Sequence, residues 1–194
     1  IQNDPAMTGS DETTQRYVQM ELGTRFVTWG GTKITRGLQN ANEPIMNMWD
    51  GNHSLWVGIR DCNIFLENID NVKDLMDHNR KRWIAEVKFL KAYYHYCLMK
   101  RYGPIPIVDV NQPISASVQD VQVYREPIEN VINYVISLLE EAMTDLPEAK
   151  EIVEGTEAGR IDKLVALTLK SEVLLFAASP LLNGNTDYSG MKDN

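Results

Sequence analysis

The sequence predicts an all-α protein, and three observations lead to that prediction. Its 194 residues are 43% hydrophobic and 24% charged, which is the composition of a folded globular protein. Only 8 prolines and 12 glycines occur, and long stretches contain neither. Within those stretches apolar residues recur at intervals of three and four, which is the spacing of one helix face.

The region before residue 45 carries the weakest pattern. Several glycines and Pro44 interrupt it, and its apolar residues gather in one short patch. This combination predicts a short helix over residues 11–22 that is followed by a loop.

Two longer helices are predicted over residues 45–69 and 80–102. Two glycines within the first cost roughly 1 kcal/mol each relative to alanine, but its apolar spacing still favours a helix. The second ends at Gly103 and Pro104, a common end for a helix. Its aromatic residues predict burial on two sides, and its apolar face consists of Trp83, Val87, Leu90, Tyr94, Leu98 and Arg101.

Two further helices are predicted over residues 124–146 and 161–182. The stretch 104–108 between the helix pairs is expected to be extended, because a residue that precedes proline avoids the α region. Residues 148–160 are expected to form an acidic loop. The face of the last helix consists of Leu164, Leu167, Ser171, Leu174, Leu175, Ala178 and Leu181.

These neighbouring amphipathic helices of about 20 residues resemble tetratricopeptide helix pairs, in which each unit buries its apolar face by stacking on its neighbours. The connection between residues 102 and 124 is too long for a regular 34-residue repeat. The predicted fold is therefore a set of tetratricopeptide-like helical repeats, degenerate in sequence, with long irregular loops.

Composition and charge argue against several classes of protein. The net charge is −8 and the basic residues are scattered, so no nucleic-acid partner is expected. No apolar run approaches the roughly 18 residues of a membrane-spanning helix, and the N-terminus does not look like a signal peptide.

Sequence motifs for catalysis, metal binding and phosphate binding are also missing. Residues 30–33 superficially resemble a phosphate-binding loop but are better interpreted as a turn. Adjacent acidic residues such as Glu140 and Glu141 are interpreted as solvated charges. We therefore predict no catalytic residue, no metal ligand, no cofactor and no enzymatic activity.

Several polar and aromatic residues within the helices are assigned structural roles. Glu86 lies among apolar neighbours and is expected to pair with an arginine. His95 is expected to be packed among tyrosines, and His78 to be solvated. Cys62 and Cys97 are expected to be buried free thiols, although a disulfide between them stays open. The aromatic residues expected to pack in the core are Trp83, Tyr93, Tyr94 and Tyr96.

Trp29, Asn40 and Asn42 are the candidate ligand-binding residues. Trp29 precedes Gly30 and Gly31 in a predicted loop that no periodic core face includes. A loop tryptophan can stack on a sugar ring while nearby amides hydrogen-bond its hydroxyl groups. The alternative for Trp29 is a plug that covers the helical core.

Four sequence blocks, in order, resemble the SusD/RagB family of nutrient-binding outer-membrane lipoproteins. Residues 86–96 (EVKFLKAYYHY) with 100–107 (KRYGPIPI) resemble the family's E-x-R-F-L-R-A-Y-Y-Y…R-x-G-x-V-P motif, with Lys88 and Lys91 in place of arginines. Trp49 with residues 59–69 (IRDCNIFLENI) resembles a second family helix. The remaining blocks are residues 159–163 (GRIDK) and 177–184 (AASPLLNG).

This resemblance implies a SusD-like α-α superhelix, with residues 1–194 as an N-terminal, tetratricopeptide-like portion of a longer family member. It implies a lipid-anchored protein on the extracellular face of the outer membrane, with its anchor outside this chain. The implied partners are an oligosaccharide or polysaccharide and a SusC-type TonB-dependent transporter. The family's glycan contacts come from loops, and Trp29, Asn40 and Asn42 are candidates by their neighbourhood.

Three alternatives remain open at this point. The chain could be a protein-interaction scaffold that docks the transporter without a sugar site of its own, or a homologue that binds a peptide. A glycoside hydrolase would need two carboxylates about 5 or 6.5–9.5 Å apart in a cleft, and the sequence indicates no such pair.

Overall fold

The computed structural model describes residues 34, 37, 38, 40, 42, 44, 47–51, 54–113, 115–117, 119, 121–153 and 155–183. The chain divides into two compact units, Ile1–Met48 and Trp49–Asn194. The helices with described bounds belong to the second unit: α4 (Leu55–Asn68), η2 (Ile69–Asn71), α5 (Asp77–Tyr102), α6 (Ile128–Asp145), η3 (Ala149–Glu151) and α7 (Lys163–Ala177). No β-strand occurs in the described part of the chain, so the all-α prediction with its helix pairs is confirmed.

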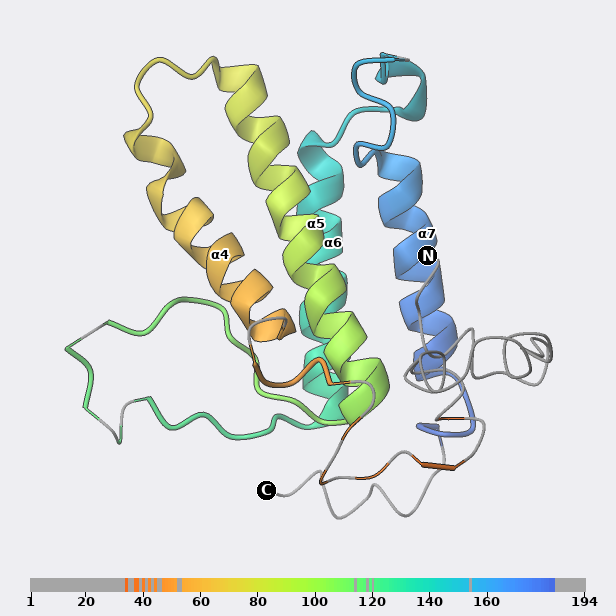
Figure 1. Ribbon diagram of the computed structural model, residues 1–194. Helices are drawn as coiled ribbons and strands as arrows, with labels where there is room; N and C mark the ends of the chain where they lie inside the picture. Colours follow the sequence, from red (N-terminus) through yellow and green to blue (C-terminus); the bar gives the residue numbers. More distant parts are fainter. Residues whose placement is uncertain are drawn as a thin grey trace, which may run out of the picture. The chain divides into compact units, whose positions relative to one another are not determined.

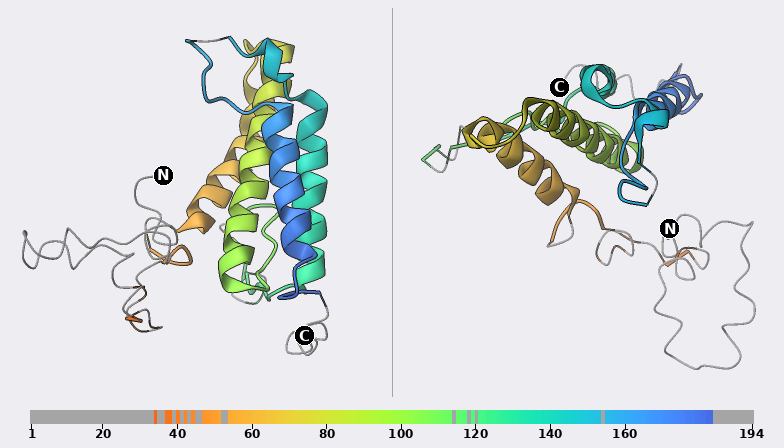
Figure 2. Two further views of the ribbon diagram at one scale, coloured as in Figure 1. Left: turned by 90° about the vertical axis from the view of Figure 1, so that its right-hand side faces the viewer. Right: turned by 90° about the horizontal axis from the view of Figure 1, so that it is seen from above.

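Successive helices run in opposite directions and pack side by side. α4 packs on α5, α5 on α6, and α6 on α7, with a smaller contact between α5 and α7. Figure 1 shows α5 between α4 and α7, with α6 behind it. In the right-hand view of Figure 2, α4 and α7 lie at opposite ends of this group. None of the described helices is long and apolar enough to cross a membrane.

The start of α4 corrects the prediction of a helix over residues 45–69. The helix begins only at Leu55, because Gly51 has a positive φ of 79° and Ser54 caps the helix. The Ser54 hydroxyl accepts a hydrogen bond from the Trp56 N–H at 3.1 Å and donates one to the Trp49 carbonyl at 2.8 Å. The short helix predicted over residues 11–22 lies outside the described residues.

The boundaries of α5 and α6 follow from glycine and proline. α5 ends at Tyr102 as predicted, because Gly103 adopts a φ of 72° and its N–H bonds the Met99 carbonyl at 2.9 Å. α6 begins four residues later than predicted, at Ile128, because Pro127 occupies its N-cap. The segment 104–108 between them has no regular secondary structure, and its predicted extended backbone stays a prediction.

A close approach joins α4 to α5. Gly58 lies so near α5 that a Cβ atom built on it would come within 2.9 Å of the Tyr94 ring. Real Cβ atoms essentially never make so short a contact, so any larger residue would force the ring or the helix to move. A glycine inside a helix weakens the helix, and here the weakness is offset by tight packing.

One hydrophobic core joins the helices of the second unit. The predicted apolar face of helix 80–102 is only partly right, because Leu98 is buried whereas Trp83 is exposed. Of the aromatic residues expected in the core, Tyr96 is buried but Trp83 and Tyr93 are exposed. The α5 residues at the centre of the core are Ala85, Phe89, Ala92, Tyr96 and Met99. α6 contributes Val131, Val135, Leu138, Leu139 and Ala142, and α7 contributes Ala166, Leu169 and Val173.

The predicted core face of α7 is wrong. Leu164 is 63% exposed and Leu175 is 74% exposed, whereas Leu169 is 7% exposed and packs on the bundle. The predicted bounds 161–182 also shorten to Lys163–Ala177. Apolar residues occur on two opposite sides of α7, so its periodicity does not distinguish the face that packs from the opposite one.

We expect the same substitution at two leucines of α7 to have unequal effects. Leu169→Ala should lower the free energy of unfolding by about 2–4 kcal/mol, because it leaves a cavity in the core. Leu175→Ala should change it by less than about 0.5 kcal/mol, because that side chain is mostly solvated. Urea unfolding of both variants measures the difference. A larger loss in Leu175→Ala would show that the packed face is assigned the wrong way round.

Candidate functional site

The three predicted ligand-binding residues belong to the unit Ile1–Met48. Trp29 lies outside the described residues. Asn40 and Asn42 are exposed, and the Asn40 side chain accepts a hydrogen bond from the Asn42 N–H at 3.0 Å and donates one to the Leu38 carbonyl at 3.2 Å. These bonds form a local asparagine turn. Ligand binding by the three residues stays a prediction.

An aromatic cluster lies where the chain enters α4. The Trp49 ring contacts the edges of Trp56 and Tyr102, with ring centres 5.2 and 5.1 Å apart. The Arg125 guanidinium lies over Trp49, 5.0 Å from the ring centre. Arg125 also donates to the carbonyls of Tyr102 and Pro104 at 3.1 and 3.0 Å. This arginine therefore joins the end of α5 to the segments before α4 and α6.

A buried lysine holds the segment that follows α5, at Asp109, against α5 and α6. Lys91 is only 2% exposed, and its Nζ donates to the Asp109 carbonyl at 2.6 Å and to the Asp109 carboxylate at 2.9 Å. The Tyr134 hydroxyl of α6 donates to the same carboxylate oxygen at 2.6 Å. Chiefly through this bond from Tyr134, the pKa of Asp109 is held below its ordinary value.

His95 lies one helical turn after Lys91 and is fully buried. Its Nδ1–H donates to the Lys91 carbonyl at 2.8 Å, and its Nε2 accepts from the Val108 N–H at 3.4 Å. Acceptance at Nε2 requires the neutral ring, and burial lowers the pKa of His95 to about 4. Asn63 of α4 binds the Val108 carbonyl at 3.3 Å, so α4 also holds this segment.

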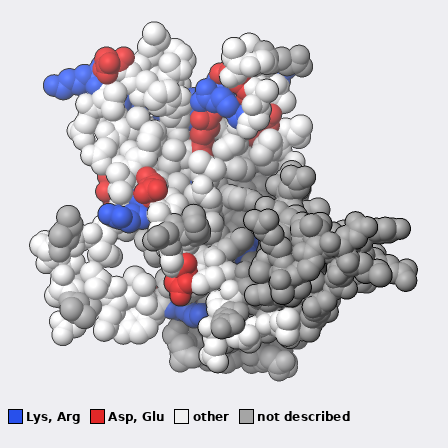
Figure 3. All heavy atoms as spheres, viewed as in Figure 1, with Lys and Arg blue, Asp and Glu red and all other residues white. Residues whose placement is uncertain are grey.

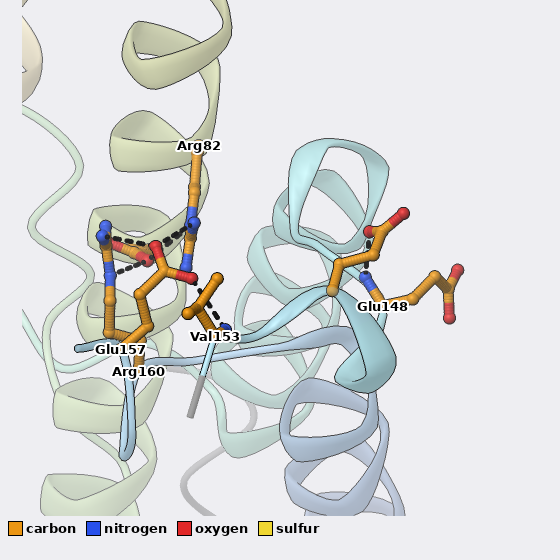
Figure 4. Close-up of polar contacts among 7 residues, drawn as sticks. Arg82, Glu148, Val153, Glu157 and Arg160 are labelled. Carbon is orange, nitrogen blue, oxygen red and sulfur yellow. Dashed lines mark hydrogen bonds and ion pairs between the residues drawn. The ribbon is translucent and has the colours of Figure 1, made fainter. Parts of the chain in front are cut away.

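A second polar network joins α5 to the loop before α7, as Figure 4 shows. The Glu86 carboxylate accepts hydrogen bonds from Arg82 at 3.3 Å and from two Arg160 nitrogens at 3.0 and 2.8 Å. Glu157 accepts from Arg82 at 2.7 Å and from the Val153 N–H at 3.1 Å. The predicted pairing of Glu86 with an arginine is thereby confirmed. Glu86 and Arg160 come from two different motif blocks.

The remaining described polar contacts between helices are mostly ion pairs of opposite charge. α6 pairs with α5 through Glu141 and Lys88, and with α7 through Glu140 and Lys170, each at 2.7 Å. On the face drawn in Figure 3, acidic and basic side chains lie in small mixed groups. Such exposed pairs contribute little stability individually.

Cys62 and Cys97 are free thiols, as predicted. Cys62 is buried, and burial raises its pKa to about 11, while Cys97 is half-buried. His95 is packed and His78 is exposed, as predicted. Sequence reasoning did not find the partners of Lys91, because Asp109 and Tyr134 lie 18 and 43 residues further along the chain. The one feature of the sequence that indicated a buried polar contact is a lysine inside the apolar stretch of α5.

The family model that matches the chain covers residues 5–173 and is the SusD-like model described as starch-binding and associating with the outer membrane. No curated protein matches the chain. Solved structures do match it. The protein named BT4246 is 33% identical, with a TM-score of 0.62, over 69% of this chain and 22% of that one.

Two further solved structures support the same fold. A SusD-like protein from Bacteroides fragilis is 27% identical over 63% of this chain and 22% of that one, with a TM-score of 0.57. A laminarin-binding SusD-like protein is 22% identical over 75% of this chain and 29% of that one, with a TM-score of 0.61. The chain therefore spans less than a third of the length of each of these proteins.

We expect the Glu86 network to stabilise the fold. Glu86→Gln removes the negative charge that Arg82 and Arg160 share, so the free energy of unfolding should fall by about 2 kcal/mol. Glu140→Gln is the matched control, because it breaks an exposed pair, and it should cost less than about 1 kcal/mol. Urea unfolding of both variants provides the comparison. Equal losses would mean that the network contributes no more than a surface pair.

We also expect His95 to make stability depend on pH. The unfolded chain protonates this ring near pH 6.5 and the folded chain only near pH 4, so stability falls as the pH drops through this interval. The shift corresponds to about 3 kcal/mol. Unfolding free energies of wild type and His95→Gln, measured from pH 7 to pH 4, should converge at low pH. A His78→Gln control should keep the wild-type loss, and parallel curves for His95→Gln would contradict the assignment.

Proposed function

The chain belongs to the SusD-like family, and from this membership we propose that it is the glycan-binding component of an outer-membrane nutrient-uptake complex. The observation that carries the proposal is the family match over residues 5–173, to a family described as starch-binding. Two polar networks, one buried around Lys91 and one half-buried around Glu86, support the family's scaffold, because they involve residues of the motif blocks and join its segments. We infer a role in binding and not in catalysis, with no cofactor required.

Glycan contacts are proposed for the loop residues and not for the helices. Trp29 would stack on a sugar ring, and the amide groups of Asn40 and Asn42 would hydrogen-bond the hydroxyl groups of the sugar. The turn formed by Asn40 supports this role for Asn42, because it fixes the backbone on which that exposed side chain stands. An aromatic ring beside a few placed polar groups is the usual composition of a small-molecule site.

The location and the protein partner are proposed from the family. Its description associates the family with the outer membrane. We propose that the chain acts on the extracellular face, held by a lipid anchor outside residues 1–194. It would pass captured oligosaccharide to a SusC-type TonB-dependent transporter. Residues 1–194 would then form the N-terminal, tetratricopeptide-like domain of a longer protein.

A second candidate function is a scaffold that binds the transporter and makes no sugar contact. One observation favours it: the motif residues with described contacts lie in the unit Trp49–Asn194, whereas the candidate sugar contacts lie in the other unit. A homologue that carries a peptide would share the same scaffold. The two candidates differ in whether this chain alone binds a glycan.

We expect calorimetric titration with maltoheptaose, followed by a panel of other glucans, to detect binding by the 194-residue chain. Trp29→Ala and Asn42→Ala should each weaken binding at least tenfold, about 1.4 kcal/mol, because each removes a direct contact. Trp83→Ala is the matched control, since it removes an exposed tryptophan of the scaffold, and it should bind as wild type does.

Two results would contradict this assignment. Absence of heat with every glucan, from a chain whose circular dichroism shows intact helices, would favour the transporter-binding scaffold. Release of shorter sugars by the purified protein would contradict the inference that the chain is not an enzyme.

A further inference from the structure

The segment that joins α5 to α6, residues 103–127, forms a loop whose base is fixed. Near its two ends, the Glu126 N–H donates a hydrogen bond to the Ile105 carbonyl at 3.0 Å. Its first limb is tied to α4, because the Asn111 N–H donates to the Glu67 carboxylate at 3.1 Å. The middle of the loop stands away from the helices in Figure 1 and in the right-hand view of Figure 2. Loops held in this way by a rigid framework often carry binding residues.

Uncharged polar side chains dominate the middle of this α5–α6 loop. Residues 110–124 contain one charged residue, Asp120, in a chain that is 24% charged. They include Asn111, three glutamines and two serines. Amide and hydroxyl groups of this kind exchange hydrogen bonds with the hydroxyl groups of a ligand, and a single carboxylate gives little attraction to a charged partner. The loop therefore fits a neutral, hydroxyl-rich ligand better than a charged one.

Tyr124 supplies an aromatic ring beside these polar groups. Its side chain is 75% exposed, and its hydroxyl donates to the Gln122 amide oxygen at 3.4 Å. That bond uses the oxygen of the amide and not its NH2 group, which has two N–H donors to offer. An aromatic face with a placed hydrogen-bond donor beside it is a common composition for a small-molecule site. It suits a sugar ring, which has an apolar C–H face and polar hydroxyl edges.

The exposed tyrosine of α5 is less suited to such a contact. Tyr93 is 43% exposed, and its ring stacks on the Phe89 ring with 6.5 Å between the ring centres. One of its faces is therefore already covered. Within the described part of the chain, Tyr124 makes no contact with another ring, so its faces are open to a ligand.

The backbone on both sides of Tyr124 is held in place. The next residue, Arg125, lies over the Trp49 ring and is bonded to the end of α5. On the other side, the Gln122 N–H donates to the Gln119 carbonyl at 3.4 Å. Fewer backbone rotations then remain to be fixed when a ligand binds, which lowers the entropic cost of binding.

We propose that Tyr124 and Gln122 form a contact site for a neutral oligosaccharide on the unit Trp49–Asn194. The Tyr124 ring stacks on one sugar, and the Gln122 NH2 group donates to a hydroxyl of the same sugar. This site is additional to the three residues predicted from the sequence, which belong to the other unit. It rests on the proposed glycan-binding function and narrows the ligand to an uncharged glycan.

Calorimetric titration of the 194-residue chain with maltoheptaose, cellohexaose and laminarihexaose tests this site. Tyr124→Ala should weaken the binding of the tightest of these glucans about tenfold, because it removes the stacking surface. Tyr124→Phe should keep the affinity within about threefold, because the ring remains. Val110→Ala is the matched control, since Val110 is an exposed apolar residue on the other limb of the same loop, and it should bind as wild type does.

Trigalacturonate, an acidic oligosaccharide, tests the ligand class and should bind more weakly than the glucan. Tighter binding of trigalacturonate would contradict the assignment to a neutral glycan. The circular dichroism of Tyr124→Ala should match that of wild type, because the side chain is exposed, and this excludes unfolding as the cause of weaker binding.

The outcomes separate this site from the proposed function. If the wild type binds a glucan and Tyr124→Ala binds it equally well, the site is wrong and the proposed function stands. If Val110→Ala loses as much affinity as Tyr124→Ala, the shape of the loop matters and not the ring, and the site is again wrong. If the wild type binds none of the three glucans, the proposed function itself is contradicted, and this site with it.

Discussion

A buried positive charge is the constraint on which the scaffold depends. Removing the Lys91 ammonium from water is costly, and only nearby acceptors offset that cost. Asp109 supplies a carbonyl and a carboxylate, and Tyr134 supports the carboxylate from α6. Because these three residues come from three segments, the charge is satisfied only when α5, α6 and the segment that follows α5 are assembled together. The network therefore stabilises the fully assembled arrangement, because a partly assembled one would leave a buried charge without its acceptors.

Local signals determined what could be predicted. Gly103 and Pro104 set the end of α5, and the apolar setting of Glu86 indicated its arginine partner, because both features act within one stretch of chain. The packed face of α7 was mispredicted because leucines occur on both of its faces, and which face packs depends on neighbours elsewhere in the chain. The partners of Lys91 escaped prediction for the same reason. The candidate sugar contacts could be named only from their neighbourhood, and Trp29 lies outside the described residues.

The motif residues with described contacts and the predicted recognition residues Trp29, Asn40 and Asn42 belong to different units of the chain. The polar groups of the motif residues are occupied within the scaffold: Glu86 accepts from two arginines, and His95 bonds two backbone groups. Groups so occupied are poorly suited to exchange partners with a ligand. Asn42 is instead an exposed loop residue, and binding residues are commonly found on loops held by a rigid framework.

The contact between Gly58 and the Tyr94 ring has a mechanical consequence. Since there is no room there for even a methyl group, a larger residue would push α4 and the Tyr94 ring apart. Trp49 lies a few residues before this point, and its ring contact with Tyr102 joins the start of α4 to the end of α5. Gly58 therefore fixes α4 against α5 at the fourth residue of the helix, and a small tilt there would be magnified toward the far end of its 14 residues.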